Sequence, residues 1–339
     1  MTGMNQKSEK IDFVITWVDG SDPVWQAEKE KYVPGQQNNS ASSNRFRDWG
    51  LLRYWFRGIE TYAPWVNHIF FVTCGHYPEW LEIDHPKLTL VRHEDFIPHQ
   101  YLPTFNSNTI LLNIHRIRGL QEHFVIFNDD MYLIRQTVPE DFFKDGLPCD
   151  AALLDSVVSW NVKDIFPHML LNNGSIINKH FQKQNVIRKE RFLFFSRKYS
   201  VNELLRNSLL APLKYFSCFR GRHLPASYTK SAFCEVWNKE EDILSETCGH
   251  RFRSPMDVTE WIFKDWMICQ GNIFPRSHKW GRHFELGTDN QEIYDAVQER
   301  RYTAVCLNDS SEDIDFEETR ERLAAAFEKL LPEKSSYEC

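Results

Sequence analysis

Two stretches of sequence decide the fold of this chain: residues 11–23 (IDFVITWVDGSDP) and residues 124–133 (FVIFNDDMYL). Each begins with a run of β-branched and aromatic residues and then meets clustered Asp or Asn. This pattern predicts a buried strand that stops abruptly at a polar turn. Asp19 and Asp22 follow the first strand, and Asp129 and Asp130 follow the second. We therefore expect carboxylates at the carboxyl ends of two strands.

The residues between these stretches alternate between helical and strand patterns. Residues 48–62 have apolar positions at helical spacing, with Asp48 as a helix cap, and residues 107–120 also indicate a helix. Residues 69–73 (IFFVT) and 88–92 (LTLVR) indicate strands. Strands that alternate with helices predict an α/β fold with a largely parallel sheet. Ligands bind beyond the carboxyl ends of such strands, so the crevice at the two acidic strand ends is the expected active site.

The second half of the chain is less regular. Residues 161–181 are polar and rich in Asn, whereas residues 228–237, 257–268 and 316–331 indicate helices. We expect a disordered N-terminus (1–10), an α/β core (11–150), a portion that caps the core (151–310), and a C-terminal helix and tail (311–339). The second half should pack on the first and complete the site.

The amino-acid composition limits the classes of protein to which this chain can belong. The 339 residues are 42% apolar and 14% aromatic, which is enough for a substantial core. A formal net charge of -7 argues against a general nucleic-acid binder. Met1 to Lys10 are polar, and no later run approaches the ~20 apolar residues that span a bilayer, so we expect a soluble protein. The eight cysteines show no C-x-x-C pair, which favours reduced thiols in a cytoplasmic protein.

Asn128, Asp129 and Asp130 are the most informative local group. Adjacent carboxylates at the end of a buried strand are costly unless a cation, hydrogen bonds or water compensate them. A hard ion such as Mg²⁺ or Mn²⁺, completed by donor phosphates, would do so. The alternative is an ordinary surface turn, and the same alternative applies to Asp12, Asp19 and Asp22. The sequence contains no Walker-type loop, G-x-G-x-x-G, H-E-x-x-H or G-x-S-x-G motif.

The order of these segments resembles the Stealth family of phosphotransferases. Residues 11–23 are similar to the family's first region, and residues 45–133 resemble the second almost throughout, including RFRDWGLLRYWFRGIETYAPWV, LPTFNSNTI and FVIFNDDMYL. Residues 223–257 resemble a looser third region, and residues 306–309 (CLND) a short fourth region. The resemblance implies a Rossmann-like, glycosyltransferase-A-like core, in which residues 11–150 would bind a nucleotide-sugar and residues 151–310 would form the acceptor or cap portion that completes the site. It also implies transfer of hexose-1-phosphate from a UDP-sugar such as UDP-GlcNAc to a glycan hydroxyl, with release of UMP.

The resemblance also implies roles for individual residues. The catalytic set is Asp12, Asp130, His223 and Arg253. The substrate-binding set is Thr16, Trp17, Asp19, Gly20, Asp22, Arg45, Arg53, His115, His250, Asp257 and Asn308. The metal set is Asp129, Asp130 and Asp309, for Mg²⁺ or Mn²⁺. Some family members carry His where this chain has Ser254, so the general base is open between Asp130 and His223.

Two other functions remain open on the sequence: a conventional glycosyltransferase that releases UDP, and a catalytically inactive glycan-binding protein. The expected partners are the UDP-sugar and a glycan acceptor, either lipid-linked or free, with homo-oligomers left open. Contact with a lipid-linked acceptor would place the protein peripherally at the inner face of the membrane.

Overall fold

The computed structural model describes residues 10–33, 47–159, 161, 163–309 and 314–339. Apart from Lys10, the expected disordered N-terminus lies outside the described residues, as does Arg45.

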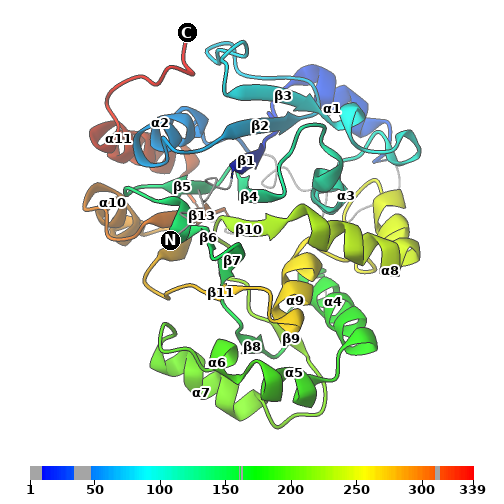
Figure 1. Cartoon of the computed structure of the whole chain (residues 1–339). Coiled ribbons are helices and arrows are strands. Elements are labelled where there is room, and N and C mark those ends of the chain that lie inside the picture. Colours follow the sequence, from blue (N-terminus) through cyan, green and yellow to red (C-terminus); the bar gives the residue numbers. More distant parts are fainter. Residues whose placement is uncertain (1–9, 34–46, 160, 162, 310–313) are drawn as a thin grey trace, which may run out of the picture.

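A five-stranded sheet forms the centre of the molecule (Figure 1). Its strand order is β10-β4-β1-β2-β3. Four strands run parallel, namely β1 (Ile11–Thr16), β2 (His68–Thr73), β3 (Leu88–Arg92) and β4 (His123–Asn128), and β10 (Ala226–Thr229) runs antiparallel at the edge beside β4. The predicted α/β fold with a largely parallel sheet is confirmed. The second half of the chain adds a strand to this sheet through β10.

Alternating apolar side chains explain why these strands are buried on both faces. In β1, Phe13 and Ile15 join one core cluster and Val14 joins the other, and Val125 and Ile126 divide in the same way in β4. Because successive strand side chains point to opposite faces, a continuous apolar run fits a sheet that is covered on both sides. The helices α2, α10 and α11 contribute to the first cluster, and α3, α4, α8 and α9 to the second (Figure 1).

Smaller sheets extend the core. β5 (Met131–Leu133) continues the chain just after β4 and pairs with β13 (Ala304–Asn308), which in turn pairs with β12 (Gly281–Glu285). The other short strands are β6 (Phe143–Lys144), β7 (Leu147–Asp150) and β11 (Phe274–Pro275) in one sheet, and β8 (Leu154–Asp155) with β9 (Cys218–Phe219) in another.

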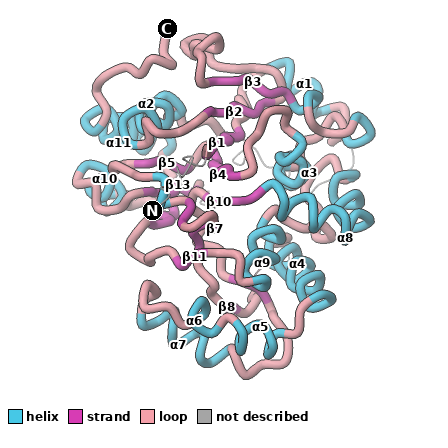
Figure 2. The backbone as a smooth tube through the Cα atoms, in the orientation of Figure 1, coloured by secondary structure: helices cyan, strands magenta, loops and turns pink. Residues whose placement is uncertain are grey.

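Between β8 and β10 the chain is mostly helical, as Figure 2 shows. The helices of the whole molecule are α1 (Pro23–Glu30), α2 (Leu52–Tyr62), α3 (Ser107–Asn113), α4 (Phe166–His180), α5 (Lys183–Lys189), α6 (Arg191–Phe194), α7 (Val201–Leu210), α8 (Lys230–Gly249), α9 (Trp261–Gln270), α10 (Gln291–Gln298) and α11 (Phe316–Leu330). Short 3₁₀ turns occupy His93–Asp95, His99–Tyr101, Ile114–Arg116 and Pro139–Asp141.

The structure differs from the sequence prediction at several boundaries. The helix predicted for residues 107–120 ends at Asn113 and continues only as a 3₁₀ turn. The start of the segment predicted as a helix at 228–237 is instead strand β10, because residues 226–229 pair with β4 and the helix begins only at Lys230. The Asn-rich segment 161–181 contains the helix α4, since Asn173 is buried and bonds Thr259. Tertiary contacts overrode local propensity here.

Within the described residues, none of the helices combines the length and apolar composition that a membrane-spanning segment requires. All eight cysteines are free thiols.

Candidate active site

The two acidic strand ends lie side by side. β1 and β4 are neighbouring parallel strands, and Thr16, the last residue of β1, pairs with Asn128, the last residue of β4. Asp19 and Asp22 therefore leave the sheet at the same edge as Asp129 and Asp130. The two acidic strand ends share one edge of the sheet, as predicted, and we call this group of carboxylates the acidic edge.

The carboxylates of the acidic edge influence one another's pKa values. Partial desolvation of the carboxylate by neighbouring atoms raises the pKa of Asp129 to about 7, although the residue as a whole is solvent-exposed, and the charges of Asp130 and Asp48 add to this shift. The pKa of Asp48 is itself raised, chiefly by burial and further by Asp19. Asp48 thus links the two strand ends electrostatically.

Sequence reasoning missed this role of Asp48. The sequence predicted that it caps the helix at 48–62, but α2 begins only at Leu52 and receives no side-chain cap. Asp48 instead closes a tight turn by accepting a hydrogen bond from the Gly50 backbone N–H at 2.9 Å, and the indole of Trp17 lies beside it. An Asp two residues before a glycine is typical of such turns, so its local pattern gave no sign of the site.

Asp130 sits at the centre of a second group. Its Oδ2 accepts a hydrogen bond from the Cys306 thiol at 3.2 Å and lies 3.6 Å from His223 Nε2. Its Oδ1 is buried without a hydrogen-bond partner. The Leu307 backbone N–H donates to Asp130 O at 2.9 Å, which fastens β13 to this edge and brings Asn308 and Asp309 towards it.

His223 is held in an unusual backbone conformation. Its φ of +46° lies in the left-handed region, which L-residues adopt only when their surroundings require it. Burial opposes charging of the ring, but the contact with Asp130 and the charges of Asp130 and Glu260 outweigh that effect and raise the pKa of His223. The ring therefore holds a proton more readily than an ordinary histidine.

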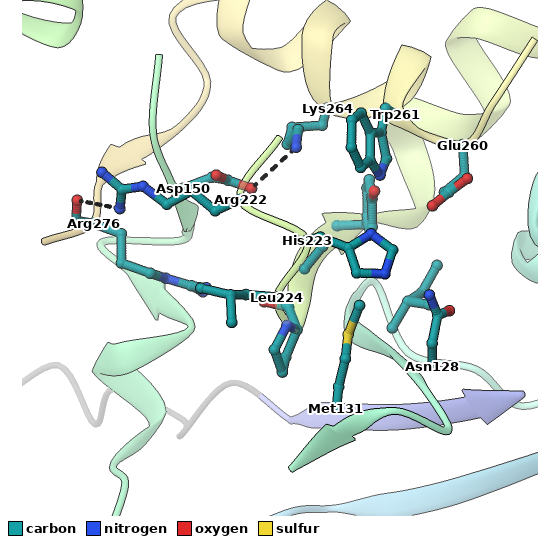
Figure 3. Close-up of a pocket in the computed structure, with 14 residues that line it drawn as sticks. Asn128, Met131, Asp150, Arg222, His223, Leu224, Glu260, Trp261, Lys264 and Arg276 are labelled. Atoms are coloured by element: carbon teal, nitrogen blue, oxygen red, sulfur yellow. Dashed lines mark hydrogen bonds and ion pairs between the residues drawn. The ribbon is translucent and has the colours of Figure 1, made fainter. Parts of the chain in front are cut away.

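Figure 3 shows His223 within a recess formed by β4, the segment after β9 and the start of α9. Glu260 and Trp261 lie on one side of the ring, and Asn128 and Met131 lie on the sheet side. Lys264 also lines the recess, with its Nζ 3.9 Å from Asp150 Oδ2. Apart from His223, the sequence pointed only to Asn128 among these residues, since the others carry no motif that could be recognised without the fold.

A network of polar contacts organises the third predicted region. Asp257 is fully buried, and its carboxylate accepts hydrogen bonds from His250 Nδ1 at 2.6 Å, Asn106 Nδ2 at 2.8 Å, Asn108 Nδ2 at 3.1 Å and the Ser254 N–H at 3.0 Å. The four donors to the Asp257 carboxylate thus come from the start of α3 and from the loop that carries Asp257. The carboxylate fixes this loop in place.

Arg253 projects from that loop towards His223. Its Nε donates to Ser107 Oγ at 3.0 Å, and its positive charge acts on both His223 and Glu260. The structure therefore brings together four predicted residues at one place: Asp129, Asp130, His223 and Arg253.

The geometry supports the predicted metal set only in part: among the described residues, the potential ligand atoms that lie within 4.8 Å of one another belong to Asp130, His223 and Cys306, and this group includes neither Asp129 nor Asp309. Asp130 Oδ1 and both carboxylate oxygens of Asp309 are buried without hydrogen-bond partners, and Arg47 lies 3.6 Å from Asp309. Burial strongly raises the pKa of the Cys306 thiol, so the sulfur stays protonated and donates to Asp130. Carboxylate oxygens, not the sulfur, are therefore the candidate ligands, and oxygen ligands suit Mg²⁺ or Mn²⁺ better than a soft metal.

Comparison with known proteins identifies the family. The model of Stealth protein conserved region 1 matches residues 9–37, and that of conserved region 2 matches residues 45–149. The chain is 39% identical over 332 residues to the capsular polysaccharide phosphotransferase WcwK of Streptococcus pneumoniae, covering 97% of this chain and 98% of that protein. The chain belongs to the Stealth family. This Stealth protein is accordingly an enzyme of the transferase class.

Two further relatives have similar coverage. The receptor polysaccharide phosphotransferase WefC of Streptococcus gordonii is 40% identical over 334 residues, covering 97% of this chain and 99% of that protein. The exopolysaccharide phosphotransferase cps2G of Lactiplantibacillus plantarum is 39% identical over 330 residues, covering 97% and 96%. The similarity thus extends well beyond the two matched regions.

The position expected for Asp12 in this Stealth enzyme is wrong. Asp12 is the second residue of β1, so it lies at the amino end of the strand, about 13 Å along it from Thr16. Its carboxylate is fully buried and accepts hydrogen bonds from Asn67 Nδ2 at 2.6 Å and the Gln121 N–H at 2.8 Å. It joins two loops at the edge opposite the site.

The position expected for His115 is also wrong. His115 lies in the 3₁₀ turn before β4, again at the amino end of the sheet, and packs against Phe233 and Trp237 at ring distances of 5.6 and 6.0 Å. Burial lowers its pKa to about 3, so the ring is neutral. It is a core residue and does not surround a phosphate.

Arg53 lies on the exposed side of α2 with its guanidinium 5.5 Å from the ring centroid of Trp80. Trp80 O in turn accepts a hydrogen bond from the N–H of Cys339, the C-terminal residue. We therefore assign Arg53 to this surface and not to the donor phosphates.

The loop after β1 is partly occupied by its own hydrogen bonds. Asp22 Oδ1 caps α1 by accepting from the Trp25 N–H at 2.6 Å, and Asp19 Oδ1 accepts from the Ser21 N–H at 2.8 Å. Gly20 O accepts from Gln26 Nε2 at 2.8 Å. Asp19 and Asp22 therefore each use one carboxylate oxygen in a local turn or helix cap, as the surface-turn interpretation predicted.

His76 is a further residue that the sequence did not single out. The Asp19 N–H donates to His76 Nε2 at 2.8 Å, and His76 Nδ1 lies 3.9 Å from Asp22 Oδ2. His76 thereby fixes the loop that carries both acids. At the other end of the edge, Asn308 Nδ2 donates to Glu285 Oε2 at 3.4 Å.

Proposed function

We propose that this Stealth enzyme transfers hexose-1-phosphate from a UDP-sugar, such as UDP-GlcNAc, to a glycan hydroxyl and releases UMP. The product would be a phosphodiester in a capsular or exopolysaccharide. Relatives named as polysaccharide phosphotransferases support phosphotransfer in polysaccharide synthesis. The observation that carries the proposal is the 3.6 Å approach of His223 to Asp130 at an edge crowded with carboxylates.

His223 is the general base in this proposal. The acceptor hydroxyl gives its proton to the His223 ring as its oxygen attacks the β-phosphorus. Asp130 orients the ring and stabilises the positive charge that the ring gains. The bond from the β-phosphorus to the bridging oxygen breaks, and UMP leaves with that oxygen. The bond between the sugar carbon and its oxygen is not touched.

Negative charge on the pyrophosphate must be neutralised. Arg253 lies near His223 and is held by Ser107, so its guanidinium is already oriented for a phosphate. Asp129, Asp130 and Asp309 would hold Mg²⁺ or Mn²⁺, which would supply further positive charge to the phosphate oxygens. Asp48 would lie behind Asp129 and keep that carboxylate in place by repulsion from the other side.

The released nucleotide tests this proposal. Purified enzyme is incubated with a panel of UDP-sugars and an acceptor glycan, and the nucleotides are separated by ion-exchange chromatography, with His223→Gln as the control. We expect glycan-dependent UMP that disappears in the variant. Glycan-dependent UDP would mean attack at the anomeric carbon and would replace the proposal with a conventional glycosyltransferase, whereas no nucleotide release from any donor would leave a glycan-binding protein.

A further inference from the structure

An apolar stripe runs along the outer side of α7. Val201, Leu205 and Leu209 are spaced four residues apart, so they share one side of the helix. They are 81%, 57% and 68% exposed. The opposite side carries Asn207, which is fully buried and hydrogen-bonded to the backbone of Leu154, Ala152 and Phe194. The stripe is therefore held facing outwards by a well-anchored helix.

The segments on either side of α7 carry further exposed apolar side chains. Phe192 on α6 is 84% exposed, and Leu213 and Tyr215, just after α7, are 52% and 59% exposed. Figure 1 shows α5, α6 and α7 together at the end of the molecule farthest from the C-terminus. Contiguous exposed apolar side chains of this kind mark an interaction surface.

The same segment is strongly basic in an acidic protein. Residues 183–215 contain eight Lys and Arg against two Glu, a surplus of six positive charges, whereas the whole chain has a net charge of -7. Arg197 and Lys198 stand just before α7, and Lys214 stands just after it. Positive side chains thus flank both ends of the apolar stripe.

We propose that α7 and its flanking residues dock this enzyme onto an anionic lipid surface. Apolar side chains that enter the boundary between headgroups and acyl chains, with Lys and Arg beside acidic headgroups, are the features of interfacial helices. A second copy of the chain fits less well, because a symmetric contact would bring two equally positive surfaces together. A nucleic acid also fits less well as the occupant, because it would leave the apolar stripe without a partner.

The docking surface is close to the recess around His223. Glu203, on the inner side of α7, accepts a hydrogen bond from Arg222 Nη2 at 2.9 Å, and Arg222 directly precedes His223. The stripe and this contact lie on opposite sides of one helix, which is about 10 Å across. If the proposed function holds, docking would keep the recess near the surface where a lipid-linked acceptor resides.

Vesicle co-sedimentation tests the docking surface without any donor or acceptor, so its outcome does not depend on the proposed function. The wild type should bind vesicles of phosphatidylglycerol mixed with phosphatidylcholine, bind phosphatidylcholine alone much less, and lose binding as salt is raised. Arg197→Gln/Lys214→Gln should weaken binding about 20-fold. Leu205→Ser/Leu209→Ser should weaken it about 10-fold or more.

A matched control removes exposed apolar groups elsewhere. Val138 and Val158 are 51% and 75% exposed, so Val138→Ser/Val158→Ser should bind vesicles like the wild type. All variants change exposed positions, and an unchanged melting temperature confirms the fold. The proposal would be overturned if the wild type did not bind anionic vesicles, or if the Leu205→Ser/Leu209→Ser variant bound them as well as the wild type does. So would gel filtration that shows a wild-type dimer and a monomeric Leu205→Ser/Leu209→Ser variant.

Discussion

Replacing Asp129 with Asn should stabilise the metal-free enzyme at alkaline pH. The unfolded chain ionises Asp129 near its ordinary pKa of 3.8, whereas partial desolvation, Asp130 and Asp48 raise the folded pKa to about 7. A carboxyl with a raised folded pKa contributes its full stability below pH 3.8 and loses it as the pH rises through 7. The folded wild type therefore loses stability across this window, and an amide at the same position does not.

The size of the stabilisation by Asp129→Asn follows from the shift in the pKa of Asp129. A change of about three pKa units would correspond to about 4 kcal/mol at pH 8 for a group shielded from water, but Asp129 is solvent-exposed, and screening by water reduces the expected effect to about 1 kcal/mol. Asn keeps the shape of the side chain, and its NH₂ group can donate to the neighbouring carboxylates. The free energy of unfolding of Asp129→Asn in EDTA should exceed that of the wild type by up to this amount.

Urea unfolding in EDTA at pH 4.5 and pH 8 measures the difference, with the exposed Asp242→Asn on α8 as the control. Added Mg²⁺ should then stabilise the wild type more than Asp129→Asn, because a ligand that binds only the folded state raises its stability. An equal stability of Asp129→Asn and wild type at pH 8, or the same gain at both pH values, would mean that the carboxylates of the acidic edge do not repel one another as described.

Three further changes probe the site and its support. Asp130→Asn should lower kcat about 100-fold or more at unchanged fold, because the ring of His223 loses its oriented partner, and near-normal turnover in a steady-state assay would remove Asp130 from the mechanism. Arg253→Gln should raise the KM for the donor about 10-fold by losing a charge-assisted phosphate contact, and a donor titration that matches wild type would contradict this. Glu338→Gln should lower the free energy of unfolding by about 3 kcal/mol at pH 7, because Arg57, only 5% exposed, bonds both Glu338 oxygens at 2.8 and 3.0 Å. Burial works against ionisation of Glu338, but the Arg57 bonds hold its pKa below its usual value, so the loss should fade as the pH falls through 4.5 and below. The exposed Glu333→Gln is the control, and a loss that persists in acid would point to a cause other than this ion pair.

The sequence predicted the parallel sheet and its acidic edge because both depend on local pattern. A continuous apolar run that ends in Asp, such as residues 124–130, fixes both a buried strand and the place where its carboxylates emerge. The shared edge then follows from the chain direction of parallel strands. The structure adds the pairing of Thr16 with Asn128, which no local pattern contains.

Residues whose role depends on long-range contacts could not be predicted. Asp48 resembles a helix cap in sequence and becomes a member of the acidic edge only because the fold brings its charge near Asp129. Asp12 and His115 stand close in sequence to strands of the site, but both belong to the opposite end of those strands. Glu260 reaches His223 only because α9 packs against the sheet, over a separation of 37 residues that local spacing does not describe.

The fate of the β-phosphorus tests the central claim most directly. A UDP-sugar labelled with ³²P at the β-position is incubated with enzyme and acceptor glycan, and the glycan is separated from the nucleotides. We expect the label in the glycan, in a linkage that resists phosphatase, with unlabelled UMP as the other product. Label that stays in UDP while the glycan gains an unlabelled sugar would contradict phosphotransfer by this site.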